Sequence, residues 1–484
     1  MSTPTSRIKR LSHWLDERTG VRHLWRGALD EPIRGGARWA YVFGSTLAFL
    51  FALQVITGML LSIYYVPSAD HAHASVAFIQ KVVRGGALLR GLHAYGASAM
   101  IILLVAHIAQ TFLYGAYKQK RELVWVVGGL LLLLILAFAF TGYLLPWDQE
   151  AYFATKVGVS IASEVPVVGP AQRRIMLGGN DLTSLTLSRF FVVHVLLLPL
   201  LLGLLIVVHV YLFRRAKPAG PFHNRNDQRA DRFFPRQLLK DSIAVLIIFG
   251  ALSALAKFLP ARLGPEADAA SIFLARPPWY FLPLFELLKY FPGKLSLIPT
   301  VLLPGLIFAL IFLLPFFDRK AERNPLRRPV ATAMFVFLLV GTVSLGALAK
   351  YQDRRNPKSN AKLKKQDEEA RAFLNSQFQP QEIGAKGESP QQKGSSAPGT
   401  VQPPAAFAEN LCATCHGGHG QGGKIGPRLV GVTSKPNRSK DDLLKLLDNT
   451  RAYGLKDPMP ASFPKLSPDD KVKIVEWLDT LKPR

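Results

Sequence analysis

Long runs of mainly apolar residues alternate with short polar segments along most of the chain. Seven such runs stand out, and they cover residues 39–66, 92–114, 123–146, 188–213, 238–259, 297–317 and 329–349. Each run is close to the roughly 20 residues that a helix needs to cross the hydrocarbon core of a bilayer. The pattern therefore predicts an all-α, polytopic membrane protein with a bundle of about seven spanning helices.

The C-terminal part of the sequence has a different pattern. Residues 351–405 are rich in Lys, Gln, Pro, Ser and Gly and contain few large apolar side chains, a composition typical of a flexible linker. Beyond them, helices are expected near 439–448 and 467–481 in a small α-helical domain. The predicted regions are a four-span domain, a three-span domain, the linker and the small domain, at residues 1–216, 217–350, 351–405 and 406–484.

Charge sets the expected orientation. The chain has 59 Lys and Arg against 33 Asp and Glu, a formal net charge of +26. The basic residues gather in the N-terminal arm and in the loops after the second, fourth and sixth runs, and such residues favour the cytoplasmic side of a membrane. A bacterial cytoplasmic membrane protein is predicted, with the N-terminus inside and, after seven spans, the C-terminal domain outside. No motif offers a surface for stacking bases, so nucleic acid is not an expected partner.

The two cysteines of the chain, Cys412 and Cys415, are followed directly by His416. The run Cys-x-x-Cys-His is the attachment signal for c-type haem. The two sulfurs would form thioethers with the haem, and the histidine would ligate its iron. A zinc site or a redox-active cysteine pair is the alternative. Bacteria attach c-type haem on the outer side of the membrane, which agrees with the predicted orientation.

Four histidines lie inside apolar runs, where polar side chains are costly and usually functional: His93, His107, His194 and His209. The first two are 14 residues apart and the last two 15 apart, so each pair shares roughly one helix face, with about 21 Å between its members. Two such helices could hold two b haems stacked across the bilayer, one between His93 and His194 and one between His107 and His209. Packing histidines are the alternative.

Glycines and arginines support the haem interpretation. A 14-residue interval recurs in the first and third runs, at Gly44, Gly58, Gly128 and Gly142. Glycine has no β-carbon and allows a flat porphyrin to approach the backbone. Arg90 and Arg189 precede His93 and His194 at the helix entrances and could pair with haem propionates. Anchoring of the helix ends is the alternative role of both arginines.

Several motifs add to the histidine pattern, and they are Arg90-x-x-His93, Thr141-Gly-Tyr143-x-Leu-Pro-Trp147-x-Gln149, Arg189-Phe-Phe-x-x-His194 and Pro277-Pro278-Trp279-Tyr280-Phe-Leu-Pro283. With them, residues 12–350 resemble cytochrome b of the quinol-oxidising bc complexes. The seven spans and the 15-residue histidine interval are similar to the photosynthetic branch of that family, whose b subunit is split in two. Here the two halves would be joined, and a c-type cytochrome domain would follow.

The resemblance implies a proton-translocating quinol–cytochrome c oxidoreductase that works by a Q-cycle. Its cofactors would be two haem b, one covalent haem c and quinol or quinone. Its partners would be a Rieske iron–sulfur protein, other cytochrome c subunits or carriers, the quinone pool and the lipid bilayer, in a dimeric complex. Two other functions are considered: a membrane cytochrome b that anchors another dehydrogenase without bifurcation, and a non-enzymatic channel or transporter. The Cys-x-x-Cys-His run argues against the second.

In the family, quinol is oxidised near the outer face, between the loop that follows the third span and the Pro-x-Trp-Tyr loop. The resemblance places Tyr143, Trp279 and Tyr280 at this site. Related sequences often carry a glutamate at the position of Pro278, where it is thought to accept a quinol proton, and proline cannot do so. Glu150 and Glu286 are the candidate replacements, and ordered water is the alternative.

The resemblance also implies a quinone-reducing site near the inner face. Lys240 and Asp241 match a Lys-Asp pair of the respiratory branch, and Arg214 matches a basic residue of the photosynthetic branch. Ordinary charged capping of membrane helices is the alternative. The photosynthetic branch attaches an extra haem to a cysteine in the first helix. Val42 occupies that position here, so covalent attachment is not expected, and an additional non-covalent haem stays open.

Met459 is expected to be the sixth ligand of the c-haem iron. It lies in the segment Asp-Pro-Met-Pro, which fits the pattern of small c-type cytochromes. A thioether ligand would raise the reduction potential relative to two imidazoles. His419 and a role for the methionine in the core are the alternatives.

Overall fold

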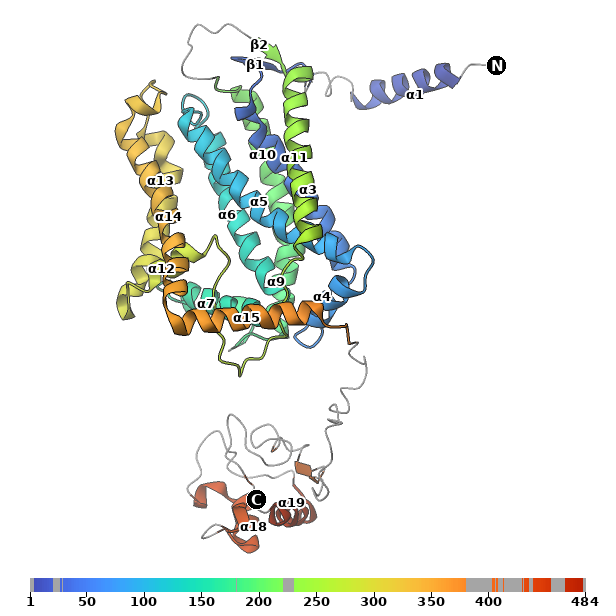
Figure 1. Cartoon of the computed structure of the whole chain (residues 1–484), viewed down its shortest axis with the longest axis vertical. Helices are drawn as coiled ribbons and strands as arrows, with labels where there is room; N and C mark the ends of the chain where they lie inside the picture. Colours follow the sequence, from blue (N-terminus) through green and yellow to red (C-terminus); the bar gives the residue numbers. More distant parts are fainter. Residues whose placement is uncertain are drawn as a thin grey trace. The chain divides into compact units, whose positions relative to one another are not determined.

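A computed structural model describes residues 4–20, 27, 29–179, 181–220, 230–379, 403–404, 406–407, 412, 429, 431–434, 438–453 and 466–481. The chain separates into two compact units, Met1–Gln381 and Glu382–Arg484, which are called the membrane unit and the second unit below. Helices dominate both, as the all-α prediction requires (Figure 1).

In the described part of the chain, seven helices are long and apolar enough to cross a membrane. They are η1 and α3 (Trp39–Tyr41, Val42–Ser62), α5 (Gly86–Leu113), α6 (Glu122–Leu144), α9, η2 and α10 (Ser184–Val192, Val193–Leu197, Leu198–Ala216), η3 and α11 (Phe233–Gln237, Leu238–Phe258), η5 and α13 (Ile298–Leu302, Leu303–Phe317) and α14 (Pro329–Arg355). The seven predicted spans are therefore confirmed.

Shorter elements occupy the connections. They are α1 (Pro4–Thr19), β1 (Pro32–Arg34), α4 (Ala72–Lys81), α7 (Gln149–Ser163), α8 (Gly169–Leu177), β2 (Ala230–Arg232), α12 (Leu282–Leu288), η4 (Gly293–Ser296), η6 (Pro325–Arg327) and α15 (Pro357–Asn375). The start of α7 is fixed by Asp148, whose side chain accepts a hydrogen bond from the Ala151 amide. Strands β1 and β2 pair antiparallel. Because each strand precedes a span, the pair connects the N-terminal end of the first span to the N-terminal end of the fifth.

The core of the membrane unit lies where α3, α5, α6, α10 and α11 meet. Leu50, Leu104, Leu131, Leu202 and Leu252 are buried there. The opposite faces of the helices are apolar and open. On the fourth span, Leu196, Leu200 and Leu204 follow one another at four-residue steps and are 58%, 65% and 61% exposed. A stripe of this kind is suited to contact with lipid, because residues four apart share one face of a helix.

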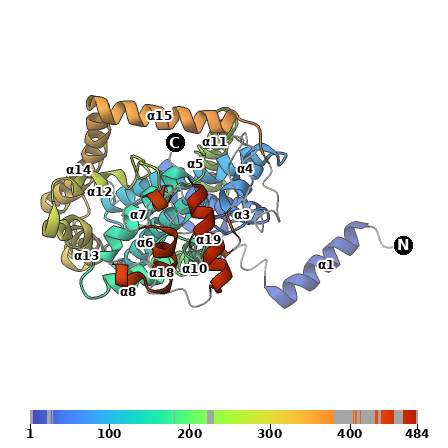
Figure 2. The same ribbon diagram turned by 90° about the horizontal axis from the view of Figure 1, so that it is seen from below.

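Helix α15 lies in a segment that was predicted to be a flexible linker. Residues 351–405 were expected to form a flexible linker, which is wrong for its first part: α14 continues to Arg355, and Pro357–Asn375 forms α15. The Asn356 side chain caps α15, and buried Ala370 together with Phe373 attaches it to the bundle. Figures 1 and 2 show α15 running from the end of α14 to α4. Residues 380–402 and 405 of the predicted linker lie outside the described residues.

The described part of the second unit contains η8 (Val432–Ser434), α18 (Lys440–Asp448), η9 (Thr450–Tyr453) and α19 (Pro468–Thr480). The two helices predicted near 439–448 and 467–481 are confirmed. Ser439 and Ser467 cap them through hydrogen bonds from the amides three residues on. Their apolar faces enclose Trp477, whose ring packs 4.7 Å from that of Phe407. The unit therefore has a small core of its own.

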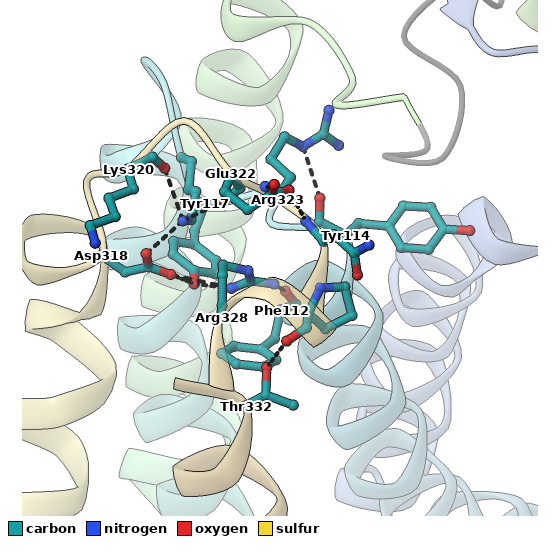
Figure 3. A network of polar contacts seen from close by, with 12 residues as sticks. Phe112, Tyr114, Tyr117, Asp318, Lys320, Glu322, Arg323, Arg328 and Thr332 are labelled. Atoms are coloured by element: carbon teal, nitrogen blue, oxygen red, sulfur yellow. Dashed lines mark hydrogen bonds and ion pairs between the residues drawn. The ribbon is translucent and has the colours of Figure 1, made fainter. Parts of the chain in front are cut away.

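A buried polar cluster joins the loop after α5 to the loop after α13 (Figure 3). The Lys118 ammonium is 2.6 Å from the Asp318 carboxylate and also donates to two backbone carbonyls. Arg328 reaches the same carboxylate at 3.2 Å and donates to the Phe112 carbonyl at 3.0 Å. The Tyr117 hydroxyl donates to Asp318 as well. One carboxylate thus holds two buried cations that come from different halves of the membrane unit.

Lys118→Met is expected to destabilise the protein strongly. Removal of one member of a buried ion pair leaves its partner uncompensated and costs about 3–5 kcal/mol. The matched control is Lys120→Met, because Lys120 is exposed two residues away, and such a surface change should cost about 0.5 kcal/mol or less. Thermal and denaturant unfolding of the purified protein in detergent measures both. Equal midpoints for the two variants would contradict a structural role for the cluster.

Candidate functional site

The first pair of membrane histidines faces one another across the bundle. His93 lies on α5 and His194 on η2, and their ring centroids are 6.3 Å apart with planes inclined by 69°. The Nδ1 atom of each ring contacts a threonine hydroxyl, Thr57 at 2.9 Å and Thr141 at 3.1 Å. Each hydroxyl donates its own proton to a carbonyl one helical turn earlier.

The threonines fix the chemistry of the two imidazoles. Since the hydroxyl proton is already committed, Nδ1 must donate its hydrogen to the threonine oxygen. The lone pair of each neutral ring is then on Nε2, which is the atom left to bind a metal. The pair is therefore arranged as two neutral ligands with fixed tautomers.

The second pair is His107 on α5 and His209 on α10. Both Nδ1 atoms are buried and make no hydrogen bond with any described residue. All four interval glycines face the four histidines: a β-carbon placed on Gly44, Gly58, Gly128 or Gly142 would meet the Cε1 atom of His107, His93, His209 or His194 at 3.9, 3.2, 3.4 or 2.5 Å. The glycines predicted to make room for a porphyrin thus lie directly against the imidazoles.

The unequal histidine intervals have a structural cause. His194 lies in η2, a π-helical turn within the fourth span. Hydrogen bonds in such a turn run from residue i to i+5 and take up one extra residue. The turn absorbs the difference between the interval of 15 in this span and the interval of 14 in α5. Both pairs can therefore face one another at matching levels.

These residues fit two haem groups. The structure offers two pairs of half-buried histidines inside the bundle, two of them with a fixed free Nε2, and a small residue against every ring. The arginines at the helix entrances are engaged elsewhere: Arg90 donates to Gln80 and to the carbonyls of Ala261 and Arg262, and Arg189 donates to the Arg174 and Ile175 carbonyls. These contacts match the anchoring role, and propionate binding by either arginine stays a prediction.

Gly142→Ala is expected to reduce the b-haem content of the protein. The added methyl group would lie 2.5 Å from the His194 ring, which must move and lose its Thr141 contact. Gly250→Ala is the matched control, since Gly250 lies in another spanning helix, α11, and its methyl group would meet no described atom within 4 Å. The ratio of extractable to covalent haem measures the effect. Similar ratios in the two variants would argue against the close fit at His194.

A cavity of about 320 Å³ lies between α6, α7, α8 and the segment 275–285. Tyr143, Pro277 and Pro278 line it together with apolar side chains. The Tyr143 hydroxyl is buried, and the Glu150 carboxylate is the polar side chain that acts on it most strongly. Trp279 and Tyr280 are not among the lining residues: the indole of Trp279 is 3.5 Å from the Ser98 hydroxyl, and Tyr280 packs against the core of the bundle.

The two candidate proton acceptors have different surroundings. Glu150, at the start of α7, is 3.2 Å from the Arg262 guanidinium and is an electrostatic neighbour of Tyr143. Burial raises the pKa of Glu150, and Arg262 opposes that rise. Glu286 is fully buried and is held by Lys289 and by the Tyr290 hydroxyl, 3.0 Å away. Neither carboxylate lines the cavity, but Glu150 interacts with Tyr143, which is a lining residue.

The residues assigned to the inner quinone site are spread over three positions. Asp241 is buried and accepts a hydrogen bond from the Gln237 amide at 2.8 Å. The Lys240 ammonium lies 5.5 Å from the centre of the Trp39 ring. Arg214 is exposed at the end of α10, and Val42 is buried at the start of α3. The site assigned to these residues stays a prediction.

Of the predicted c-haem residues, Cys412 is described and packs against the core of the second unit. Cys415, His416 and Met459 lie outside the described residues. Thr57 and Thr141 are functional residues that the sequence reasoning missed. A signal for them exists, because Thr57-Gly58 and Thr141-Gly142 are the same dipeptide, placed in each run just before an interval glycine.

Three family models match the chain. Residues 29–217 match the model described as cytochrome b/b6/petB, residues 271–360 the one for cytochrome b (C-terminal)/b6/petD, and residues 404–482 the one for cytochrome c. The "Cytochrome bc complex cytochrome b subunit" of Chlorobaculum thiosulfatiphilum is 39% identical over 316 residues, which cover 62% of this chain and 72% of that protein. The chain belongs to the cytochrome b family.

Other matches agree with this. The "Menaquinol:cytochrome c reductase cytochrome b subunit" of Geobacillus thermodenitrificans is 39% identical over 222 residues, 44% of this chain and 99% of that protein. A solved structure titled "Hyperthermophilic respiratory Complex III" superposes with a TM-score of 0.63 at 30% identity, and covers 76% of this chain and 97% of that one. This cytochrome b is therefore of the bc type, is fused to a c-type cytochrome domain, and is a haem-binding electron-transfer protein of the membrane.

Proposed function

We propose that this cytochrome b oxidises quinol in the cavity beside Tyr143 and moves electrons across the membrane by a Q-cycle. The observation that carries the proposal is the place of that cavity. Tyr143 lines it with a buried hydroxyl that interacts with Glu150. A quinol bound there could form a hydrogen bond with Tyr143. This residue directly follows Gly142, which lies against His194 of the first histidine pair.

Two b haems would be held by His93 with His194 and by His107 with His209. A c haem would be held by Cys412, Cys415, His416 and Met459. Bound haem iron supplies a one-electron carrier whose potential depends on its ligands. The chain's own contribution is to keep the imidazoles neutral and oriented through Thr57 and Thr141, and to exclude water with the apolar core of the bundle.

Oxidation of one quinol to quinone releases two electrons and two protons. In the proposed reaction one electron leaves through a Rieske iron–sulfur partner to the c haem, and the other crosses the membrane to a quinone near Lys240 and Asp241. The two cysteines of the chain both belong to the c-haem motif, so the iron–sulfur cluster must be bound by another subunit. Tyr143 orients the quinol and Glu150 accepts a proton.

The proposal includes an orientation and an assembly. The cavity and α15 lie at the outer face of a bacterial cytoplasmic membrane, and the Lys118 cluster lies at the inner face, where basic loops gather. A dimeric complex with a Rieske protein and further cytochrome c subunits or carriers is expected. The titles of the Geobacillus protein and of the Complex III structure support such partners.

Quinol-dependent haem reduction tests the function. The complex is purified through this chain, and reduction of b and c haems is followed optically after addition of a short-chain quinol. We expect both haem types to be reduced, and c-haem reduction to require the iron–sulfur subunit. Reduction of the c haem at the same rate after removal of that subunit would contradict bifurcation. No quinol-dependent reduction of either haem would contradict the function itself.

A further inference from the structure

Helix α15 contacts the candidate proton acceptor through a single arginine. The Arg262 guanidinium lies between two carboxylates, with Nε 3.2 Å from Glu150 and a terminal nitrogen 3.1 Å from Asp367 of α15. Its other terminal nitrogen is 3.5 Å from the Gln366 carbonyl, also on α15. All three nitrogens of the Arg262 side chain thus have partners: one contacts Glu150 at the start of α7, and two contact residues of α15.

The backbone around Arg262 and the helix α15 opposite it are each held by further contacts. Its own carbonyl accepts a hydrogen bond from buried Arg90, and the Gly264 amide donates to Asp148, which caps α7. Helix α15 is held at its far end, where Lys81 donates to the Phe373 carbonyl and the Phe373 ring packs 4.9 Å from that of His73. Asp367 also pairs with Arg371 of the same helix, 2.9 Å away, so its position does not depend on Arg262 alone.

The same C-terminal segment holds the second wall of the cavity. Arg276 directly precedes Pro277, and its guanidinium donates two hydrogen bonds to the Asp353 carboxylate of α14, at 2.5 and 2.8 Å. Such a bidentate pair fixes geometry as well as charge. The end of α14 and helix α15 thus contact two points of the connection between α11 and α12, one beside Glu150 and one at the wall of the Tyr143 cavity.

We propose that Arg262 is a positioning residue for quinol oxidation, held by Asp367 so that α15 orients the Glu150 carboxylate beside Tyr143. The proposal rests on the function proposed above. It assigns to α15, which follows the last span, a role in the outer quinol site. Arg262 itself does not touch the cavity; it acts through Glu150.

The charged and titratable groups that face Glu150 are Arg262, Asp148, Tyr143 and Asp367. Arg262 lowers the pKa of Glu150, whereas the charge of Asp367, acting through space, raises it. Loss of Arg262 should therefore raise the pKa of Glu150 further. The rate of quinol oxidation should then need a higher pH, because a protonated carboxyl cannot accept a proton.

A double-mutant cycle in the full complex tests the proposal. Arg262→Gln should move the acidic limb of the pH–rate profile to higher pH by about one unit or more, the usual effect of an opposite charge nearby. Asp367→Ala should move it in the same direction by less, because Arg262 loses its anchor. In the Arg262→Gln background, Asp367→Ala should no longer move the profile to higher pH, and only the opposite effect of losing its through-space charge should remain. Asp367→Glu should restore the parent profile.

The matched control is Glu369→Ala, which removes an equal charge from the exposed face of α15, where Glu369 pairs with Lys365. Its profile should equal that of the parent. A shift to lower pH in Asp367→Ala would mean that Asp367 acts only through space, and additive shifts in the double variant would mean that it does not act through Arg262; either result overturns the proposal. If Glu150→Gln leaves the rate unchanged, the assignment of Glu150 fails instead.

Discussion

Alanine at His93 and alanine at His194 are each expected to remove the same b haem and to leave the other b haem and the c haem in place. The two rings are 6.3 Å apart and come from helices that are distant in the sequence, so each variant deprives one shared site of a ligand. His107→Ala and His209→Ala should both remove the second b haem. Haem extraction, with redox titration of the optical bands, distinguishes the two components.

His73→Ala is the control for this series. His73 is also buried in the membrane unit, but its Nε2 atom is 2.8 Å from the Gly264 carbonyl, and it lies outside both pairs. It should retain both b haems. If His93→Ala and His194→Ala removed different redox components, the pairing across α5 and η2 would be incorrect. Steady-state quinol oxidation should be lost when either histidine pair is removed, since the electron route across the membrane needs both b haems.

Glu150→Gln should slow quinol oxidation by about 10²-fold or more, because a positioned acid–base group contributes about 10²–10⁴-fold. In the parent protein, burial raises the pKa of Glu150. The protonated fraction is therefore larger at low pH than for an ordinary glutamate, and the parent rate should rise as the pH increases through this raised pKa. The glutamine variant should lose that rise. Single-turnover reduction of the b haems across pH 5–9 measures both effects.

Glu286→Gln provides the contrast. Glu286 is buried against Lys289 and Tyr290 and not against the cavity, so its loss should lower the unfolding midpoint and affect the rate much less. Haem content should stay normal in the Glu150 variant, which separates a lost proton acceptor from a misfolded subunit. A parent-like rate and pH profile in Glu150→Gln would show that the proton leaves by another group or through water.

Periodic features of the sequence were sufficient for much of this picture. Seven apolar runs predicted the seven spans, and the interval shared by histidines and glycines indicated a common site, where the structure places the glycines against the imidazoles. These features repeat along single helices, so they can be read without knowledge of tertiary contacts. The family resemblance assigned Tyr143 to the quinol site; the structure places this residue at a cavity, and its role there stays a prediction.

Contacts between distant segments could not be predicted in the same way. The pair of Arg262 with Asp367 depends on how α15 lies across the loops, which no local pattern records. The helix itself carried a readable signal, since Asn356-Pro357 is a helix start and the Lys, Glu and Ala residues that follow favour helix. Its low content of large apolar residues suggested disorder, but Ala370 and Phe373 provide enough packing to fix it.

The Lys118–Asp318 cluster and the β1–β2 ribbon hold the first four spans and the last three together without help from the peptide link at residues 217–230. A related protein can consist of less than half of this sequence, since the Geobacillus protein aligns over 99% of its length with 222 residues here. Linking two segments that already bind one another chiefly raises their effective concentration. The consequence of the fusion is therefore one of stoichiometry: each di-haem half is made with one quinol-loop half and one c-type domain, in a fixed ratio that does not depend on separate synthesis.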